Sequence, residues 1–201
     1  MSPGAIIAGA TLDPDAPLTW STGAMTTAGF AAVCAEVASR DRPSVLECGS
    51  GFSTLTLATV VRERGGRLVS LEHDATWAAR VRSNLAAAAL AETARVMLAP
   101  LQPHPLARDG LLWYAEHQLR FLPRRIDLLL VDGPPAFEPE TELSRYPALP
   151  ALAERLAPDA TVVLDDIDRR GELQVLQAWE RECGFRFEIQ PTMRIAVGRR
   201  S

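Results

Sequence analysis

Residues 47–54 read Glu-Cys-Gly-Ser-Gly-Phe-Ser-Thr and lie between an apolar run and a stretch with helical periodicity. Two glycines at such a strand-to-helix turn, Gly49 and Gly51, let the backbone approach a ligand closely. The third glycine of a dinucleotide-binding turn would fall at Thr54, so the pattern departs from that fingerprint. Glu47 places a carboxylate two residues before the first glycine, which suits a ligand with an ammonium group better than a pyrophosphate. The alternative is that the glycines only close a tight turn.

A second acidic residue follows the next apolar run. Residues 67–71 have strand character, and Glu72 comes directly after them, about 20 residues beyond the glycine turn. An acid at this place binds ribose hydroxyls in nucleoside-binding α/β folds. A solvated Glu72 is the simpler alternative, but Glu47, the glycines and Glu72 together favour a cofactor that contains a nucleoside.

Short apolar runs alternate with amphipathic stretches on both sides of this region. Runs without period-two alternation are typical of strands buried on both faces of a sheet. Their alternation with helices predicts an α/β fold with an open, doubly wound, mostly parallel sheet, as in Rossmann-like folds. We expect strands at 44–48, 67–71, 95–98, 126–131 and 161–164, and helices at 26–39, 53–64, 75–91, 111–121, 146–156 and 171–183. The strand-like runs 185–190 and 193–198 are too close for a crossover helix and predict a C-terminal antiparallel hairpin.

The composition fits one enzyme-sized domain. For 201 residues that are 47% hydrophobic, we expect a loose leader at 1–19 and a single domain at 20–201. We find no secretory signal and no apolar run near the ~20 residues of a membrane span. Three cysteines are too few for a disulfide framework and favour the cytoplasm. The net charge of −4 argues against nucleic acid as a partner. All 21 basic residues are arginine, so no lysine can act as a base.

The segments ECGSGFSTLTLA at 47–58 and VSLEHD at 69–74 resemble the first motif and its acidic successor in class I S-adenosylmethionine-dependent methyltransferases. The sheet of that family also ends in an antiparallel hairpin, and the resemblance extends from Trp20 to the end. It implies that the glycine turn passes under the methionine part of the cofactor. Glu47 would bind the amino group, directly or through water, and Glu72 the ribose hydroxyls. The resemblance implies further cofactor contacts by Ser53, Thr54, His73 and Asp132 and by residues 21–25. Pro100 and Leu101 would lie beside the adenine.

Three aspartates follow the last two predicted parallel strands, Asp132 after 126–131 and Asp165 with Asp166 after 161–164. Because ligands of open α/β sheets bind outside the carboxyl ends of the strands, we expect these side chains to converge beside the glycine turn. Three carboxylates without arginine partners repel one another, and a hard divalent cation relieves this repulsion with oxygen ligands. The alternative is capping of a turn by Asp132 and of the next helix by the cluster from Asp165 to Asp168.

The metal hypothesis gains support from a resemblance to catechol-type, metal-dependent O-methyltransferases. These place one aspartate after the fourth strand and an Asp-Asn pair after the fifth. Asp166 stands where they have asparagine, and Pro135 where they often have a lysine base, so the lysine role is not carried over. The resemblance implies that Asp132, Asp165 and Asp166 are catalytic and hold Mg²⁺ or a similar ion. The ion would acidify the acceptor hydroxyl, with Asp132 or a histidine accepting the proton.

The segments LEHD, LLLVDGPP, RYPALP and VVLDDIDR make the chain similar to small bacterial methyltransferases found near glycan genes. This resemblance implies O-methylation of a small carbohydrate acceptor, a sugar hydroxyl on a mannoside or a methylated oligosaccharide. We expect Arg145 and Tyr146 to overhang the same rim, as candidates for acceptor contacts, with a solvated turn as the alternative. A phenolic or other natural-product hydroxyl is the alternative acceptor, and a homodimer stays open.

Two alternatives belong to other classes, a non-catalytic nucleoside-binding module and a nicotinamide oxidoreductase. The missing third glycine and Glu47 argue against the oxidoreductase. The segment DGPPAF at 132–137 is shifted from the acid-Pro-Pro-aromatic pattern of DNA amino-methyltransferases, which agrees with the acidic charge. His104 and His117 are expected on the surface.

Overall fold

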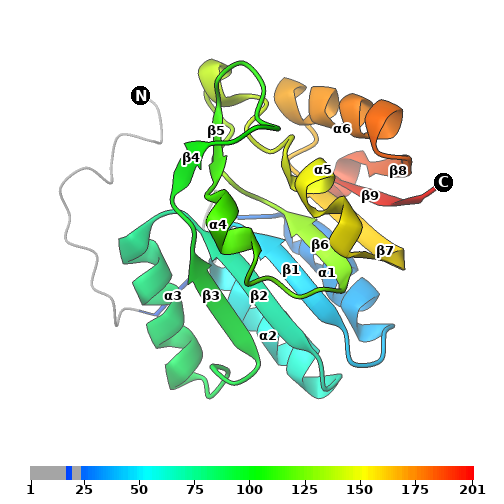
Figure 1. Ribbon diagram of the computed structural model, residues 1–201. Coiled ribbons are helices and arrows are strands. Elements are labelled where there is room, and N and C mark those ends of the chain that lie inside the picture. Colours follow the sequence, from blue (N-terminus) through cyan, green and yellow to red (C-terminus); the bar gives the residue numbers. More distant parts are fainter. Residues whose placement is uncertain (1–16, 20–23) are drawn as a thin grey trace.

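A seven-stranded sheet forms the centre of the molecule (Figure 1), in a computed structural model that describes residues 17–19 and 24–201. The strand order is β3-β2-β1-β6-β7-β9-β8. The first five strands of this order run parallel, whereas β9 is antiparallel to both β7 and β8. The bounds are β1 Ser44–Cys48, β2 Arg67–Glu72, β3 Ala94–Leu98, β6 Ile126–Val131, β7 Leu156–Asp165, β8 Phe185–Gln190 and β9 Ile195–Arg200. The prediction of an open, mostly parallel sheet with a C-terminal antiparallel hairpin is confirmed.

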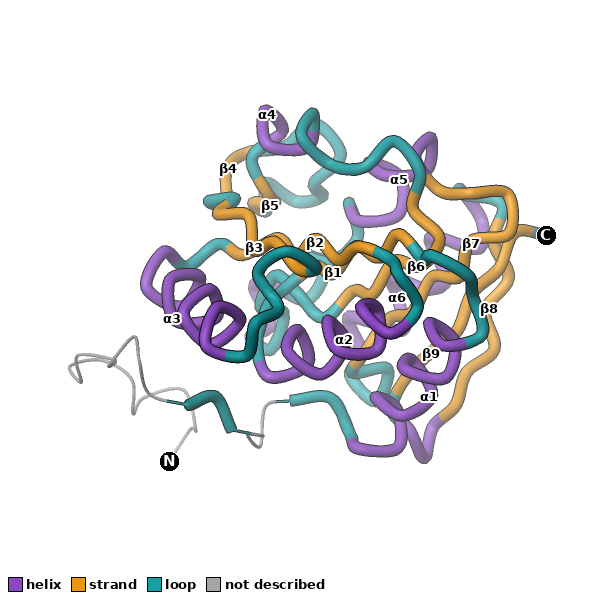
Figure 2. The backbone as a smooth tube through the Cα atoms, turned by 90° about the horizontal axis from the view of Figure 1, so that it is seen from below, coloured by secondary structure: helices purple, strands orange, loops and turns teal. Residues whose placement is uncertain are grey.

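Helices cover both faces of the sheet, and Figure 2 shows α1, α2 and α3 on the side opposite to α4 and α5. The apolar side chains of α1, α2 and α3 share one core cluster with the sheet, and those of α4, α5 and α6 share the other. Because both faces are covered, every residue of the central strand β6 is buried. The bounds are α1 Thr27–Ala38, α2 Phe52–Glu63, α3 Ala75–Ala87, α4 Glu116–Leu119, α5 Ala148–Leu152 and α6 Arg170–Glu182, with short 3₁₀ helices at Pro139–Thr141, Ala153–Arg155 and Pro191–Met193.

The helix expected at 111–121 is wrong. Strand β5 (Leu112–Tyr114) pairs with β4 (Leu101–Pro103) in a separate antiparallel ribbon, and only the single turn of α4 follows it. Leu112 is exposed, whereas Trp113 and Tyr114 are buried in the core. Cross-strand pairing and the burial of these two aromatic side chains outweigh the helical pattern of the apolar residues.

The helix expected at 146–156 is correct in place but shorter, because α5 gives way to a 3₁₀ turn and β7 already begins at Leu156. At the N-terminal side, Leu18 is buried in the core and its amide donates to Asn84 Oδ1 at 3.0 Å. The end of the predicted leader therefore packs against α3, while residues 1–16 lie outside the described part. Within the described residues, no helix combines the length and apolar character that a membrane span needs.

Candidate active site

A cavity of about 820 Å³ opens at the carboxyl ends of β1, β2 and β6, where the sequence predicts the ligand. Its walls come from the glycine turn after β1, the end of β2, the start of α3 and the loop after β6. Thr19, Ala24 and Met25 close it from the N-terminal side. The latter two belong to the predicted cofactor segment 21–25, whereas Ser21, Thr22 and Gly23 lie outside the described residues.

The two glycines of the turn meet different constraints. Gly49 has a φ of 90°, and a Cβ there would lie 3.3 Å from the carbonyl carbon and oxygen of Asp132. Packing against the loop after β6 and a left-handed backbone both favour glycine at this position. Gly51 has an extended backbone, and among the described residues a Cβ there would meet the Trp77 ring alone, at 3.9 Å. The protein's own packing leaves open space at Gly51, on the wall of the cavity, where a ligand can approach the backbone.

Glu47 is buried behind the glycine turn and does not line the cavity itself. Its carboxylate accepts hydrogen bonds from Ser53 Oγ and Thr54 Oγ1, each at 2.7 Å, and from the hydroxyl of Ser70. Burial raises its pKa, although the three hydroxyl groups act in the opposite direction. Ser53 does line the cavity, so this hydroxyl separates Glu47 from any ligand above the turn.

Glu72 ends β2 and lines the cavity. One carboxylate oxygen accepts from the amide and hydroxyl of Ser50, at 3.1 and 2.8 Å, and the other from the amides of His73 and Asp74, at 2.8 and 2.9 Å. The His73 ring adds a contact of 3.0 Å. Burial raises the pKa of Glu72, but these hydrogen bonds outweigh it and lower the pKa overall. Glu72 is therefore an ionised acceptor fixed at the floor of the cavity.

Several residues of the cavity were not identified from the sequence. Trp77, in the first turn of α3, donates from Nε1 to the carbonyl oxygen of Ser50 at 2.7 Å and so holds the glycine turn from outside. The sequence did contain a signal for Trp77. It follows Asp74, the N-cap of α3, by three residues, so both residues belong to the helix turn that begins directly after Glu72 and His73. Pro100 and Leu101 do not line the cavity. The other unpredicted lining residues are Thr19, Ser50, Phe52, Asp74, Thr76, Tyr114, Gly133, Pro134, Pro135, Phe137 and Arg169.

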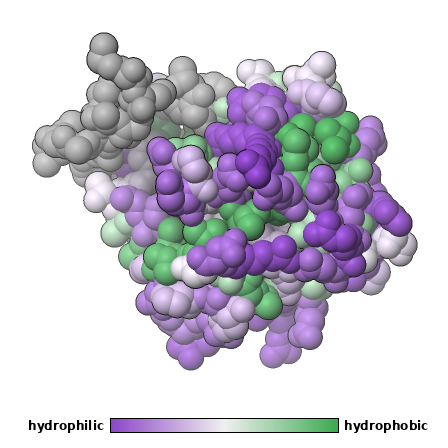
Figure 3. Space-filling view, turned by 90° about the horizontal axis from the view of Figure 1, so that it is seen from above, coloured by the Kyte–Doolittle hydropathy of each residue, from purple (hydrophilic) through white to green (hydrophobic). Residues whose placement is uncertain are grey.

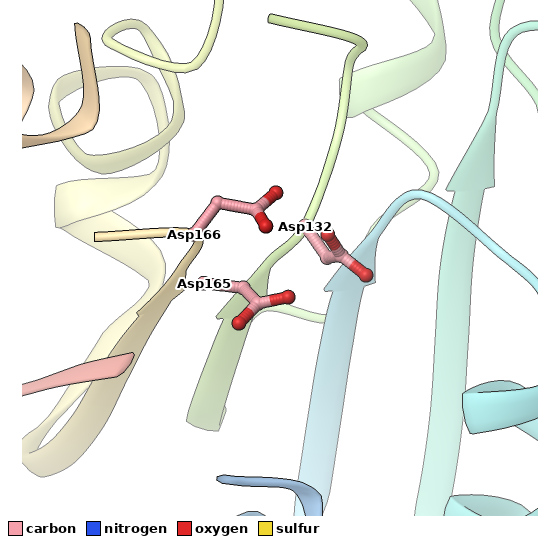
Figure 4. A group of neighbouring side chains, drawn as sticks. All are labelled: Asp132, Asp165 and Asp166. Carbon is pink, nitrogen blue, oxygen red and sulfur yellow. The ribbon is translucent and has the colours of Figure 1, made fainter. Parts of the chain in front are cut away.

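The three predicted aspartates come together. Each of Asp132, Asp165 and Asp166 offers a carboxylate oxygen, and these oxygens lie within 4.8 Å of one another. Figure 4 shows the carboxylates turned toward a common point at the ends of β6 and β7. Capping does not explain the pair after β7, since α6 begins at Arg170 and its N-cap, Arg169, makes no side-chain capping bond. The neighbouring parallel strands β6 and β7 bring the side chains together.

Arginine side chains surround this cluster, contrary to the expectation. Arg145 is buried, and its Nη2 lies 3.4 Å from Asp132 Oδ1 and 3.1 Å from Asp166 Oδ2. Arg169 Nη1 lies 2.8 Å from Asp166 Oδ2, and Arg194 Nη2 lies 2.6 Å from Asp166 Oδ1. The premise that the carboxylates lack arginine partners is wrong.

These contacts decide how well the cluster suits a metal. Both oxygens of Asp166 already bind guanidinium groups, and Oδ1 of Asp132 faces Arg145. Among the described residues of the cluster, Asp165 keeps a buried oxygen, Oδ1, without a hydrogen-bond partner. A divalent ion with three carboxylate ligands does not fit this arrangement, because Arg145 fills the space between two of the ligands.

Burial changes the acidity of the cluster. It raises the pKa of Asp132 well above its ordinary range, and Arg145 acts in the opposite direction. Burial and the neighbouring Asp166 raise the pKa of Asp165 to about 6. Glu172, in the first turn of α6, lies 3.5 Å from Arg145 Nη1, and burial raises its pKa to about 7. The site thus holds acidic groups that can exchange protons near neutral pH.

The remaining predicted residues are placed as follows. Tyr146 does not line the cavity; its hydroxyl donates to Glu182 Oε2 at 2.5 Å, and Arg108 stacks 3.7 Å above its ring. His104 is not a surface residue, because its ring packs edge-on against Trp113 with centroids 5.1 Å apart and is largely buried. His117 is exposed, as expected.

Comparison with known proteins agrees with this fold and cavity. The family described as "Methyltransferase domain" matches residues 46–167, more than half of the chain. No curated protein matches the chain in sequence. The similar solved structures include the SAH-bound methyltransferase PaMTH1 of Podospora anserina, which is 14% identical with a TM-score of 0.69 over 89% of this chain and 80% of that one.

Two O-methyltransferases are also similar in structure. An SAH complex of a Bacillus cereus O-methyltransferase is 17% identical, with a TM-score of 0.64 over 89% of this chain and 83% of that one. TomG of Streptomyces achromogenes, an O-methyltransferase of tomaymycin synthesis in complex with SAM, is 16% identical, with a TM-score of 0.62 over 92% of each chain. At these identities the likeness shows the fold alone.

The sheet order and the glycine turn, with an acid at the end of β2, define the class I S-adenosylmethionine-dependent methyltransferases. The chain belongs to the methyltransferase-domain family, whose matched segment runs from β1 through the Asp165–Asp166 pair.

Proposed function

We propose that the protein is an S-adenosylmethionine-dependent O-methyltransferase that acts on a small hydroxylated acceptor. The acceptor group that we favour is a sugar hydroxyl. The observation that carries the proposal is one cavity with Glu72 and the glycine turn on one wall and Asp132 on another. The adenosine and methionine parts of the cofactor belong at the first wall, which leaves the reactive methyl group facing the second. The SAM and SAH complexes of proteins with this fold support this cofactor.

The chemistry requires alignment and one proton acceptor. The acceptor oxygen attacks the methyl carbon in line with the sulfonium, the carbon–sulfur bond breaks, and the cofactor leaves as a neutral thioether. Holding oxygen, methyl and sulfur in this geometry is the main contribution of the enzyme. Asp132 lines the cavity and is the candidate that takes the hydroxyl proton, since burial raises its pKa toward the range of a useful base.

The acceptor side of the cavity has both polar and apolar walls. Asp132 offers its carboxylate, whereas Pro134, Pro135 and Phe137 form an apolar wall. Arg145 and Asp166 also line the cavity, but they are already paired with their own neighbours. The face of the molecule that is seen from above Figure 1 carries both hydrophilic and apolar residues (Figure 3). A sugar presents hydroxyl groups at its edge and C–H groups on its faces, and so fits both kinds of wall. A phenolic hydroxyl is the second candidate, and the exposed ring of Phe137 is the feature that favours it.

Two measurements test this function. Differential scanning fluorimetry should show stabilisation by S-adenosylhomocysteine, because a ligand that binds only the folded state raises Tm. Stabilisation by NAD instead would contradict the cofactor. Transfer from labelled S-adenosylmethionine to mannosides, oligosaccharides, phenols and nucleic acid should then identify the acceptor class. Cofactor binding without transfer to any acceptor would favour a non-catalytic nucleoside-binding module.

A further inference from the structure

We propose that Arg145 is the built-in cation of the aspartate cluster, taking the place of a divalent metal, and that methyl transfer needs no bound metal ion. This inference rests on the proposed function for its catalytic meaning. Its structural part, that Arg145 prevents metal binding, stands on the geometry of the cluster alone.

Arg145 is held in one position by acceptors on all sides. Its Nε donates to the carbonyl oxygen of Pro134 at 3.3 Å, Nη1 to that of Asp165 at 3.2 Å, and Nη2 to that of Asp132 at 3.1 Å. The carboxylates of Asp132, Asp166 and Glu172 surround the same guanidinium at 3.4, 3.1 and 3.5 Å. Because guanidinium has five donors in a fixed plane, this set of partners fits arginine and not a mobile surface cation.

A metal ion would compete with this guanidinium for the same space and charge. Magnesium binds carboxylate oxygens at about 2.0–2.1 Å in octahedral geometry. To join Asp132 and Asp166, it would have to displace Arg145 Nη2, which bridges these two side chains. Displacing Arg145, of which only 3% is exposed, would break its hydrogen bonds to the carbonyl oxygens of Pro134, Asp165 and Asp132. A buried guanidinium next to a divalent ion would also add strong like-charge repulsion.

The charges of the cluster are partly balanced without a metal. Five carboxylates, those of Asp132, Asp165, Asp166, Asp168 and Glu172, face three guanidinium groups, those of Arg145, Arg169 and Arg194. The repulsion that would call for a metal is therefore relieved by side chains of the chain itself. Arg169 and Arg194 pair with Asp166, and in the part of the chain that the structure describes Arg145 is the one cation within 4 Å of the Asp132 carboxylate.

Arg145 thereby acts as a positioning residue. It joins the end of β6, the end of β7 and the start of α6, and it fixes the side chain of Asp132 at the cavity wall. In the proposed reaction the acceptor hydroxyl gives its proton to Asp132 and its oxygen takes the methyl group. Arg145 exchanges no proton or electron in this step. It supplies the positive charge and orientation that a metal would otherwise supply.

The first test uses the intact wild-type protein and Mn²⁺ as a spectroscopic probe for a divalent ion. After exhaustive dialysis against chelator, titration followed by electron paramagnetic resonance should show no specific Mn²⁺ site. Turnover in excess EDTA should equal turnover with added Mg²⁺. A specific Mn²⁺ site that is lost in Asp165→Ala would overturn the proposal, even if methyl transfer is confirmed. Failure of methyl transfer with every acceptor would overturn the proposed function, while the Mn²⁺ titration still decides the role of Arg145.

The second test removes the guanidinium. Arg145→Ala should lose turnover by about 10²-fold or more, as for loss of an oriented electrostatic group, while its affinity for S-adenosylhomocysteine stays close to wild type. It should also gain Mn²⁺ binding, because Asp132 is freed next to the unpartnered Oδ1 of Asp165, whereas Asp166 stays paired with Arg169 and Arg194. Arg145→Lys, which keeps a charge but not the planar fork, should recover part of kcat at unchanged cofactor affinity. Arg186→Ala, on the exposed side of β8, is the matched control and should change none of these values.

If Arg145→Ala does not fold, Arg145→Lys and the wild-type titration decide the question. Full kcat in Arg145→Ala, or an unchanged metal response in a folded variant, would contradict the proposal.

Discussion

The hydroxyl of Tyr114 occupies the space that a side chain on Gly133 would need. A Cβ on Gly133 would lie 2.7 Å from Tyr114 Oη and 2.9 Å from the Cα of Gly49. The loop after β6, the glycine turn after β1 and the end of β5 therefore meet in close contact below the cavity. This contact sets the distance between the wall proposed for the cofactor and the wall that carries Asp132.

Gly133→Ala should destabilise the protein by about 1–3 kcal/mol, because an added methyl group in a packed site forces the backbone to move. Tyr114→Phe alone should cost less stability than Gly133→Ala, since the contact of the buried hydroxyl with the backbone of Gly49 is too poorly aligned to count as a full hydrogen bond. The double variant should lose less stability than the sum of the losses in the two single variants, because removing the Tyr114 hydroxyl relieves one of the close contacts of a side chain at position 133. Chemical denaturation of the four proteins measures this coupling, and strictly additive effects would show that the hydroxyl does not restrict position 133.

Glu72 should dominate the affinity for the cofactor. Its carboxylate lines the cavity and is kept ionised by the Ser50 and His73 donors. Charged hydrogen bonds to ribose hydroxyls predict a loss of about 1.5–3 kcal/mol in Glu72→Ala. Calorimetric titration with S-adenosylhomocysteine gives this value directly.

The carboxylate also accepts two backbone amides of its own loop, so the variant needs a control for folding. Glu72→Gln keeps an acceptor oxygen and should retain most of the stability while losing the charge-dependent part of the affinity. Glu188→Ala, on the exposed face of β8, should leave both quantities unchanged. Unchanged cofactor affinity in folded Glu72→Ala would remove Glu72 from the binding site.

Phe137 should act on the acceptor and not on the cofactor. Its ring is 61% exposed, an unusual state for a large apolar side chain, and it stands on the wall of the cavity beside Pro135. We expect Phe137→Ala to raise KM for the acceptor by about 5- to 30-fold, the value of one lost stacking contact of 1–2 kcal/mol, with little change in the affinity for S-adenosylhomocysteine.

A second exposed phenylalanine provides the matched control. Phe121 is 54% exposed but does not line the cavity. Phe121→Ala should leave KM and kcat unchanged, whereas Phe137→Trp should preserve the acceptor KM because it keeps a flat aromatic surface. Equal effects of the two alanine substitutions would indicate a general loss of stability instead of a contact to the acceptor.

The sheet was predictable because its signals are local. The apolar runs of β1, β2 and β6 lack the period-two alternation of a half-exposed strand, and the last two strands are separated by too few residues for a helix. The segment around Trp113 failed because its apolar residues fit a helix as well as a strand, and pairing with Leu101–Pro103 decided between them. Residues 111–121 by themselves do not indicate which segment they pair with.

The position of the site was also predictable, but not all of its charged groups. The turn at Gly49 and Gly51, Glu72 and the three aspartates follow from strand ends and the parallel sheet, and the structure brings them to one rim. Arg145 was expected at this rim as an acceptor contact, but its pairing with the aspartates, and the approach of Arg169 and Arg194, were not. Arg145 reaches the cluster from a loop after β6, and Arg194 reaches it from a left-handed turn before β9. Their approach depends on tertiary packing, so the charge balance that governs metal binding could not be inferred from the sequence.

Glu172 should make the stability of the protein depend on pH. It is fully buried beside Arg145, and burial raises its pKa from 4.5 to about 7, although Arg145 and Arg169 act in the opposite direction. The folded state therefore binds the proton more tightly than the unfolded state. This contribution to the free energy of unfolding is full below pH 4.5, falls as the pH rises toward about 7, and is constant above that. At about 1.4 kcal/mol per pKa unit, the loss amounts to about 3 kcal/mol.

Glu172→Gln cannot ionise, so it should lack this contribution. Urea denaturation at a series of pH values should show the wild type losing stability relative to Glu172→Gln between about pH 4.5 and 7. The comparison is one of slopes, and so it does not depend on whether the amide packs as well as the acid. Glu188→Gln, which is exposed, should run parallel to the wild type. If Glu172→Gln also runs parallel to the wild type, the carboxyl group is ionised in the folded state throughout this range, and Arg145 neutralises it more strongly than burial disfavours its charge.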